Sequence, residues 1–372
     1  MNSLQLCAPC LFGLEGILGN ELRRMDADNV KAENGRVFFE GGPEILARAN
    51  ICSRYAERIQ VVMGRFKAKS FESLFENVRS LPWERFVGKS DRFPVKGWSL
   101  ESALHSVPDC QSIIKKAVVE RLKERYRTSW FDETGLLYQI QFTILKDEVT
   151  VLIDSSGAGL HKRGYREIAG VAPLKETLAA AIVDLAHARK ARRVFDPCCG
   201  SGTLLIESAF AALGIAPGVN RKFSSSDWSQ VPRAVWKQER DRARQAERRD
   251  VNFSAFGSDI DKQAIDLTLE NAKKADVARL VSAKQADLSD FKIDDGGGVV
   301  LCNPPYGERL ADINQAERLI RIMGRVFKPG NGWSYYIISS HEQFEKLFGR
   351  PADKRRKLYN GMLKCQLYMY YR

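Results

Sequence analysis

The sequence lacks the features that mark secreted and membrane proteins. Residues 1–13 have neither a basic segment nor a long apolar core, so we expect no secretory signal. No stretch approaches the roughly 18 uninterrupted apolar residues that a membrane span requires. Histidines number only four, and none lies beside a Ser or Cys motif that would indicate a catalytic triad. These absences predict a cytoplasmic protein with no membrane partner.

Cysteines give no sign of a metal site. The eight cysteines are scattered along the chain. Cys7 and Cys10 have the spacing of half a zinc site, but no second close pair follows them. We therefore expect reduced thiols and no metal.

Positive charge is what the sequence has in excess. The net charge is +12, although hydrophobic residues (44%) and charged residues (28%) are present in ordinary proportions. Residues 1–160 carry 22 basic and 21 acidic side chains, whereas residues 161–372 carry 36 and 25. A basic second half suits a polyanionic partner, most simply nucleic acid, although a solvated surface explains net charge equally well.

The length of 372 residues predicts two or three domains, and hydrophobic periodicity divides the chain into three. Residues 1–67 follow the order strand, helix, strand, helix, strand, which is typical of a small ferredoxin-like α+β domain. Residues 68–156 form a second α+β unit. Its helices are expected at 71–78 and 112–126, and its strands at 93–100, 136–145 and 148–153.

Small residues from Ser155 to Gly159 are expected to form a flexible linker. Several basic side chains near this boundary are candidates for RNA contact. They are Lys115 and Lys116 on the helix at 112–126, and Lys162, Arg163 and Arg166 after the linker. Charge on the outer face of a helix is more often only solvated, and this alternative stays open.

Residues 157–372 alternate between strand and helix, which predicts a parallel, doubly wound α/β sheet. A helix at 174–188 precedes the first strand. The strands are expected at 193–196, 255–259, 281–285, 299–302 and 333–339, with a closing antiparallel pair within 357–371. An insertion at 214–252 contains a helix of mixed charge. The first interpretation of this helix is a solvent-exposed surface helix, and the second is an RNA contact.

The loop from Asp196 through Pro197, Cys198 and Gly200 to Gly202 follows the first strand of this sheet. Its glycines let a ligand approach the backbone closely, and the helix that follows favours a carboxylate or phosphate. The spacing is not G-x-G-x-x-G and no Walker lysine follows, so pyrophosphate cofactors are disfavoured. An acid at the start of the loop instead suits a ligand with an amino cation beside its carboxylate.

Two more acidic positions follow the next two strands. Asp259 can bind a ribose diol, Ile260 can pack on an adenine ring, and Asp287 can accept from an adenine amino group. Each aspartate alone has a structural alternative, because aspartates cap helices and begin turns. Three aspartates that each follow a successive strand are less easily explained by capping alone. Together they indicate a binding site for S-adenosylmethionine.

Asn303, Pro304, Pro305 and Tyr306 come directly after the strand at 299–302. The Asn amide oxygen can accept from an amino group, the prolines stiffen the turn, and Tyr offers a flat face. This combination suits an exocyclic amine on a planar base, although Asn and Pro are also ordinary turn residues.

As a set, Asp196–Gly202, residues 257–261, residues 286–287 and residues 303–309 resemble the motifs of class I methyltransferases that act on base amino groups. The domain order resembles that of the THUMP-domain RNA methyltransferases, and residues 160–166 and 172–177 match the entry to their catalytic domain. The sequence most resembles the bacterial guanine-N2 methyltransferases of 23S ribosomal RNA, and next to them it resembles the archaeal tRNA guanine-N2 enzymes.

The resemblance implies a ferredoxin-like domain at 1–67, an RNA-binding THUMP domain at 68–156 and a Rossmann-like methyltransferase domain at 157–372. It implies S-adenosylmethionine as cofactor, RNA as partner, and methyl transfer to the N2 amine of a guanine by the Asn303–Tyr306 turn. The Cys198-Cys199 pair departs from relatives, which often have a bulkier first residue. An adenine-N6 or cytosine-N4 methyltransferase, and a non-catalytic RNA-binding ribosome-assembly factor, remain as alternatives, and no motif specifies the oligomeric state.

Overall fold

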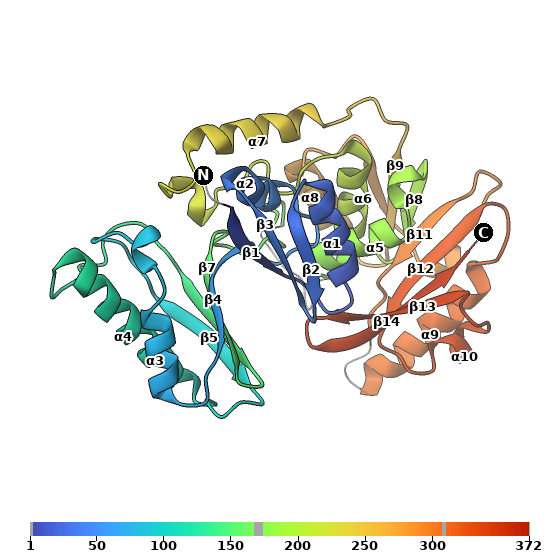
Figure 1. Cartoon of the computed structure of the whole chain (residues 1–372). Helices are drawn as coiled ribbons and strands as arrows, with labels where there is room; N and C mark the ends of the chain where they lie inside the picture. Colours follow the sequence, from blue (N-terminus) through green and yellow to red (C-terminus); the bar gives the residue numbers. More distant parts are fainter. Residues whose placement is uncertain (1–2, 167–173, 307–309, 372) are drawn as a thin grey trace.

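The computed structural model describes residues 3–166, 174–306 and 310–371. These residues form two seven-stranded sheets with helices packed against them (Figure 1). None of the helices in these three segments combines the length and the apolar character that crossing a membrane requires.

The first sheet has the strand order β2-β3-β1-β4-β7-β6-β5. Its elements are β1 (Leu4–Pro9), α1 (Glu15–Arg24), β2 (Asp28–Glu33), β3 (Arg36–Gly41), α2 (Pro43–Cys52), β4 (Gln60–Lys67), α3 (Phe71–Arg79), β5 (Val95–Leu100), α4 (Val107–Tyr126), β6 (Ile140–Leu145) and β7 (Glu148–Asp154). Most of these were predicted from the sequence. Strand β2 was missed because it is an edge strand of largely exposed polar residues, which gives no hydrophobic alternation.

Strand β4 joins the two predicted front units into one sheet. Val61 on β4 pairs with Leu6 on β1 on one side and with Ile153 on β7 on the other. The hydrogen-bonded ladder therefore runs from the ferredoxin-like region into the second unit without a break. We refer to residues 3–156 as the front half.

The segment from Ser155 to Gly159 is not the flexible linker that its composition predicts. Ser155 and Ser156 are fully buried. Asn50 Nδ2 donates to Ser155 Oγ (2.9 Å), and Ser156 Oγ donates to Asn50 Oδ1 (2.6 Å). Small side chains were needed here for close packing under α2, and composition alone cannot separate that need from flexibility.

The second sheet has the order β10-β9-β8-β11-β12-β14-β13, and the predicted doubly wound sheet is confirmed. Strand β14 runs antiparallel to both of its neighbours. The elements are α5 (Glu176–Leu185), β8 (Arg193–Asp196), α6 (Thr203–Leu213), α7 (Arg233–Gln245), β9 (Ser254–Asp259), α8 (Lys262–Lys274), β10 (Val281–Gln285), β11 (Gly298–Cys302), α9 (Leu310–Val326), β12 (Trp333–Ser339), α10 (Phe344–Phe348), β13 (Lys354–Asn360) and β14 (Leu363–Tyr370). Helices α9 and α10 were not predicted.

Alternating side chains of this sheet enter two different cores. Leu301 and Ile338 belong to a core that continues through α5 and α6 into the front half. Val300 and Ile337 belong to a separate core that includes Phe327 at the end of α9. The sheet is therefore covered on both faces, as a parallel sheet requires.

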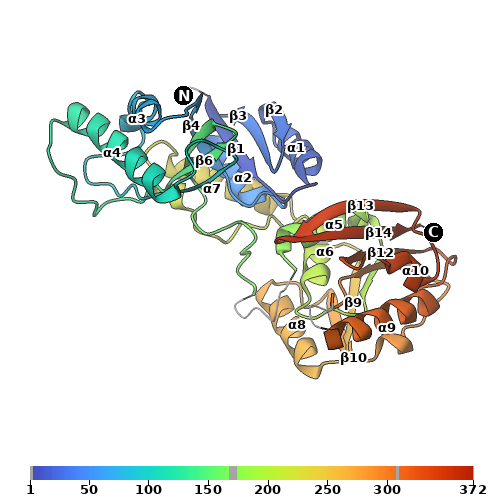
Figure 2. The same ribbon diagram turned by 90° about the horizontal axis from the view of Figure 1, so that it is seen from below.

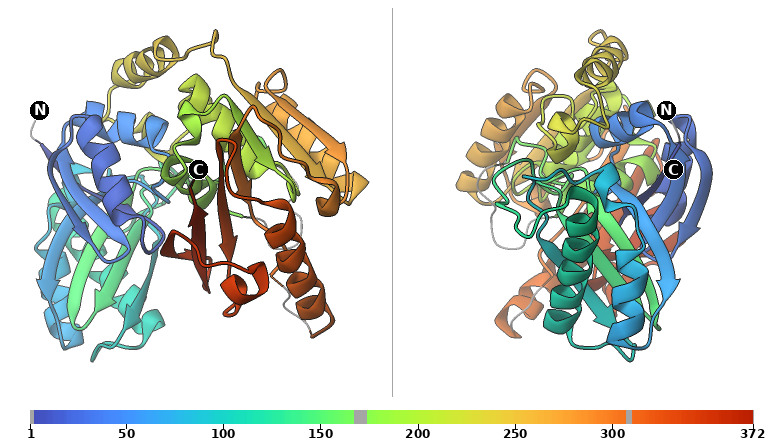
Figure 3. Two further views of the ribbon diagram at one scale, coloured as in Figure 1. Left: turned by 90° about the vertical axis from the view of Figure 1, so that its right-hand side faces the viewer. Right: turned by 60° about the vertical axis from the view of Figure 1, so that its left-hand side comes forward.

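Helix α7 and the turn before it lie apart from the second sheet, beside the front half (Figure 3). The mixed-charge helix is not wholly exposed, because Trp236 and Glu239 are buried. Arg48 on α2 makes two hydrogen bonds to the Glu239 carboxylate, of 2.8 and 2.9 Å. The insertion therefore braces the second half of the chain against the first, which its charge pattern alone did not reveal.

Trp228 from the insertion is buried in the front half. Its ring stacks on Tyr138 at a centroid distance of 4.7 Å, and its indole N–H donates to the Leu137 carbonyl (3.4 Å). Trp228→Ala should lower the free energy of unfolding by about 3–5 kcal/mol, because it leaves a large cavity between the two halves. The urea midpoint followed by far-ultraviolet circular dichroism measures this loss. Trp130→Ala is the matched control, since Trp130 is 73% exposed and its removal should change the midpoint little.

Candidate functional site

The order of the second sheet reverses between β8 and β11, which lie side by side in parallel. Val194 on β8 pairs with Val299 on β11, and Phe195 pairs with Val300. The chain leaves β8 at Asp196 and β11 at Cys302, so the loops that follow lie side by side at the carboxyl edge of the sheet, and we refer to the space between them as the crevice. Open α/β sheets bind their ligands at such a point.

Helix α8 fixes the loop after β8. Thr268 Oγ1 donates to the Gly200 carbonyl (2.8 Å), and Asn271 Nδ2 donates to the Ser201 carbonyl (3.0 Å). Both side chains are buried. Sequence reasoning missed these two positioning residues, although two polar residues three apart on the apolar face of a predicted helix were a usable signal.

Asp196 is a buried carboxyl at the end of β8. Its Oδ1 accepts from the Cys198 backbone N–H (3.1 Å). Burial raises the pKa of Asp196 to about 8, the Cys198 hydrogen bond opposes this rise, and the charge of Asp259 adds to it. A cationic group placed beside Asp196 would favour its ionised form.

Asp259 at the end of β9 completes the loop geometry. Its Oδ2 accepts from the Gly200 N–H (3.0 Å) and its Oδ1 from the Asp261 N–H (3.1 Å), so each oxygen keeps one lone pair for a ligand. The neighbouring Ile260 is 67% exposed, which leaves an apolar face for a planar ring. Gly200 has a φ of +52°, and no atom lies within 4 Å of the Cβ it lacks.

Asp287 lies at the adjacent strand end, where the Ala286 N–H donates to the Asp259 carbonyl (3.0 Å). Its Oδ1 accepts from both the backbone N–H and the hydroxyl of Ser289, at 2.7 and 2.6 Å. These bonds lower the pKa of Asp287. The capping role that was the structural alternative is therefore real, and a ligand role would use the other oxygen.

The turn after β11 places Asn303 and Tyr306 together. The Tyr306 hydroxyl donates to Asn303 Oδ1 (2.5 Å). Tyr306 packs against the core, and burial, with the Cys365 thiol as the next cause, raises its pKa. Pro304 is buried and Pro305 is exposed. Residues 307–309 of the predicted motif lie outside the described residues.

Two of the five predicted RNA contacts, Arg163 and Arg166, have guanidinium groups that are paired with buried carboxylates of this chain, which disfavours contact with RNA. Arg163 lies beside the buried Glu207 (Nε to Oε1, 3.4 Å) and donates to the Arg54 carbonyl (2.6 Å). Arg166 forms an ion pair with Glu176 (3.0 Å), and both side chains are largely buried. Basic residues beside an aromatic predicted a nucleic-acid surface, but the carboxylates that pair with them are distant in sequence.

The three predicted lysines have different surroundings. The Lys115 ammonium lies 3.5 Å from the centre of the Phe93 ring and pairs with Glu133, so it is half-buried. Lys116 and Lys162 are exposed. Only these two of the five predicted side chains remain fully accessible to RNA.

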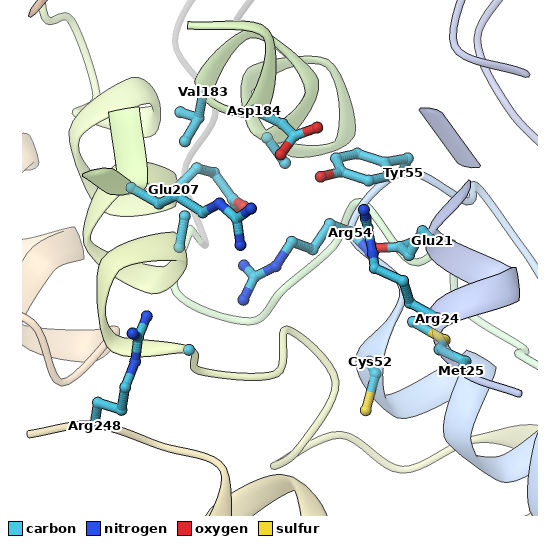
Figure 4. A pocket seen from close by; sticks show the side chains of 14 residues that line it. Glu21, Arg24, Met25, Cys52, Arg54, Tyr55, Val183, Asp184, Glu207 and Arg248 are labelled. Carbon is cyan, nitrogen blue, oxygen red and sulfur yellow. The ribbon is translucent and has the colours of Figure 1, made fainter. Parts of the chain in front are cut away.

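A separate cavity of about 260 Å³ lies where α1 and the end of α2 meet α5 and α6 (Figure 4). Arg54, Tyr55, Asp184 and Glu207 are among its lining residues. None of the predicted cofactor or catalytic residues lines it, so it is distinct from the crevice. In the three described segments, no group of three or more His, Cys, Asp or Glu side chains could hold a metal ion.

Comparison with known protein families finds three successive domain types along the chain. A model of RMKL-like methyltransferase domains matches residues 163–369, a model of the RlmL ferredoxin-like domain matches residues 5–60, and a THUMP domain model matches residues 68–154. The chain belongs to the RMKL-like methyltransferase family. The predicted ferredoxin-like, THUMP and Rossmann-like domains are thereby confirmed.

Several full-length relatives share the whole architecture. One relative is "Putative RNA methyltransferase YpsC" of Bacillus subtilis, with 42% sequence identity. The alignment covers all of this chain and 97% of that protein. A second relative, of known crystal structure, is a predicted N6-adenine-specific DNA methylase from Listeria monocytogenes, with 46% sequence identity. The superposition covers all of this chain and 97% of that one, with a TM-score of 0.93. This chain is also 40% identical to SMU.472, a putative methyltransferase complexed with SAH, over the whole of this chain and 98% of that one, with a TM-score of 0.94.

Gly200 and Gly202, in the loop after β8, can be compared by the same substitution to alanine. Both have positive φ, +52° for Gly200 and +77° for Gly202, so alanine strains the backbone by about 1–2 kcal/mol at either position. At Gly202 the new Cβ would also lie 2.8 Å from Thr268 Cγ2, whereas at Gly200 it would meet nothing. Thermal unfolding should therefore show a larger loss of stability for Gly202→Ala. Equal losses would contradict the packing of α8 on the loop.

Proposed function

We propose that this protein transfers a methyl group from S-adenosylmethionine to the N2 amine of a guanine in RNA, with 23S ribosomal RNA as the first candidate substrate. The observation that carries the proposal is the position of Asn303–Tyr306 at the end of β11, directly beside the loop that follows β8. An amine-accepting side chain and a cofactor loop thereby face one crevice. A tRNA guanine is the alternative RNA substrate.

The cofactor of this methyltransferase is S-adenosylmethionine, and a homologue of 40% identity is complexed with SAH. The residues of the crevice fit it. Asp196 would lie near the ammonium group, the open side of Gly200 would admit the backbone of its amino-acid part, and Asp259 would bind the ribose hydroxyls. The exposed face of Ile260 suits the adenine ring, and Asp287 suits the adenine amino group. Bound there, the cofactor supplies a methyl group on a positively charged sulfur.

The protein's task is to present an amine whose lone pair is delocalised into the base. Asn303 Oδ1 and the Pro304 carbonyl can accept the two amine hydrogens and so turn the lone pair toward the methyl group. Tyr306 already donates to Asn303 Oδ1, which has a second lone pair for the substrate. In this arrangement Tyr306 positions Asn303, and the predicted stacking on the base would require the ring to turn. Positioning of this kind supplies much of a transfer rate.

Support for RNA comes from the front half and from the relatives. A THUMP domain precedes the methyltransferase domain, and the Bacillus subtilis relative is named as an RNA methyltransferase. The Listeria relative is named as an adenine-specific DNA methylase, which favours the rival assignment to an adenine N6 amine. The Asn-Pro-Pro-Tyr chemistry serves either base.

Identification of the methylated nucleoside separates these assignments. The purified protein is incubated with labelled S-adenosylmethionine and RNA from cells that lack it, and the nucleosides are separated after digestion. We expect label in N2-methylguanosine, and mapping of the labelled position identifies the RNA. Label in N6-methyladenosine or N4-methylcytidine, or transfer to DNA only, would refute the guanine assignment.

Asn303→Ala should lower the methylation rate by roughly 10²–10³-fold, because it removes an acceptor aimed at the reacting amine. Cofactor affinity measured by calorimetry should stay within about twofold. Tyr306→Phe is the matched variant, since it keeps the ring and removes only the bond to Asn303, and it should lose less activity. Near-normal turnover of Asn303→Ala would show that the proposed role is wrong.

Cofactor binding should release a proton from Asp196. Because the pKa of Asp196 is raised to about 8, this carboxyl is protonated in the free protein at pH 6.5. An ammonium group beside it favours the ionised form, so binding expels close to one proton, and affinity rises with pH toward 8. Calorimetry in two buffers of different ionisation enthalpy measures the release. Asp196→Asn should abolish it, and proton uptake by the wild-type protein would contradict the model.

A further inference from the structure

The turn between β13 and β14 presents an apolar side chain to solvent. Asn360 pairs with Leu363, so Gly361 and Met362 form a two-residue loop. Met362 is 99% exposed and Leu363 is 37% exposed. Short hairpin loops usually contain Gly, Asn, Asp or Ser, and nothing in the packing of the hairpin calls for Met at its tip.

The register of the second sheet places this turn at the methyltransferase crevice. Cys302 on β11 is level with Ile337 on β12, and Ser339 at the end of β12 pairs with Gln366 on β14. The three residues back to Leu363 extend the hairpin about 10 Å past that edge, at roughly 3.4 Å per residue. Tyr306 of the Asn303 turn lies against Cys365, so the hairpin forms one wall of the site.

The hairpin is held rigidly. Figures 1 and 2 show β13 and β14 as a long antiparallel ribbon at one edge of the second sheet. Arg356 donates to the Gly13 carbonyl (2.7 Å), and Phe12 packs edge-on against Tyr359 at 5.8 Å. Gly361 has a φ of +62°, as a tight hairpin turn requires. The ferredoxin-like domain therefore supports the ribbon from outside, and its tip is a fixed projection.

Two lysines, Lys357 and Lys364, flank the tip. The other basic residues of the ribbon are farther from it, where Arg355 pairs with Glu345 (3.1 Å) and Arg356 binds the Gly13 carbonyl. Lys357 lies 5.3 Å from the centre of the Tyr359 ring, and Tyr359 pairs across the ribbon with Lys364. A basic ribbon with an exposed apolar tip is complementary to the phosphates and stacked bases of a nucleic acid.

We propose that Met362 is a wedge that enters the base stack of the nucleic-acid substrate and fills the space left when the target nucleotide turns into the Asn303 crevice. This proposal rests on one part of the proposed function, namely that the substrate is a nucleic acid. It does not depend on which base is methylated. Lys357 and Lys364 contact the flanking phosphates. A paired base costs free energy to extrude, and an apolar side chain that replaces it in the stack lowers this cost. Met362 is thus a positioning residue rather than a catalytic one.

The test compares one target nucleotide in two settings. The substrate is the RNA fragment that carries the mapped methylation site, prepared once with the target base-paired and once with the opposing nucleotides removed. The full-length wild-type protein, Met362→Ala and Met362→Leu are assayed on both for kcat/KM. Met362→Ala should lose roughly tenfold or more on the paired fragment, where extrusion must be driven, and stay within about twofold on the unpaired one. Met362→Leu should restore activity on the paired fragment.

Four results would overturn the wedge. They are a natural target that is already unpaired, an equal loss on the two fragments, no loss on either, and failure of leucine to rescue. Met362 is exposed, so the alanine variant should unfold at the wild-type temperature, and this is checked first. If the wild-type protein methylates neither fragment, the proposed function itself fails and the wedge falls with it, which is a different pattern from any of the four.

Discussion

The site depends on one pairing, the parallel contact between β8 and β11. Its register sets the loop of Asp196 beside the turn of Asn303, although more than one hundred residues separate the two in the chain. Every other element of the crevice is arranged around this contact. Thr268 and Asn271 on α8 fix the loop from one side, and the β13–β14 hairpin supports Tyr306 from the other. A shift of register by one residue would point the strand side chains to the opposite faces and separate the two halves of the site.

Buried polar contacts make the front half a fixed arm rather than a mobile domain. Arg54, which follows α2, donates to the Ile215 carbonyl (2.7 Å), and Arg163 donates back to the Arg54 carbonyl (2.6 Å). The continuous core and the bracing helix α7 add to this. Such contacts are costly to break, because each leaves a charged group without a partner in a dry environment. The position of the THUMP domain relative to the crevice is therefore set by the fold.

The hairpin connects this arm to the chemistry. Phe12 and Gly13 of the ferredoxin-like domain contact β13, and Cys365 on β14 contacts Tyr306, which in turn donates to Asn303. A domain without any predicted catalytic residue thereby supports the wall of the crevice. This arrangement couples the ferredoxin-like domain to the methyltransferase domain through the hairpin.

The sequence by itself determined most of the helices and strands, the doubly wound sheet, the loop at Asp196–Gly202 and the turn at Asn303–Tyr306, because these depend on local periodicity and on residues close together in the chain. Only the tertiary structure decided which charged side chains are exposed to solvent and which are paired inside the molecule. Arg163 and Arg166 were predicted on a surface and are buried against Glu207 and Glu176, and the small residues at 155–156 were predicted to be flexible and are packed under α2. It also revealed β2, the bracing role of α7 and the position of Met362 at the crevice. The reason is that burial and pairing depend on contacts between segments that are distant in sequence. The type of a residue gives the chemistry of its side chain but not which other residues it contacts.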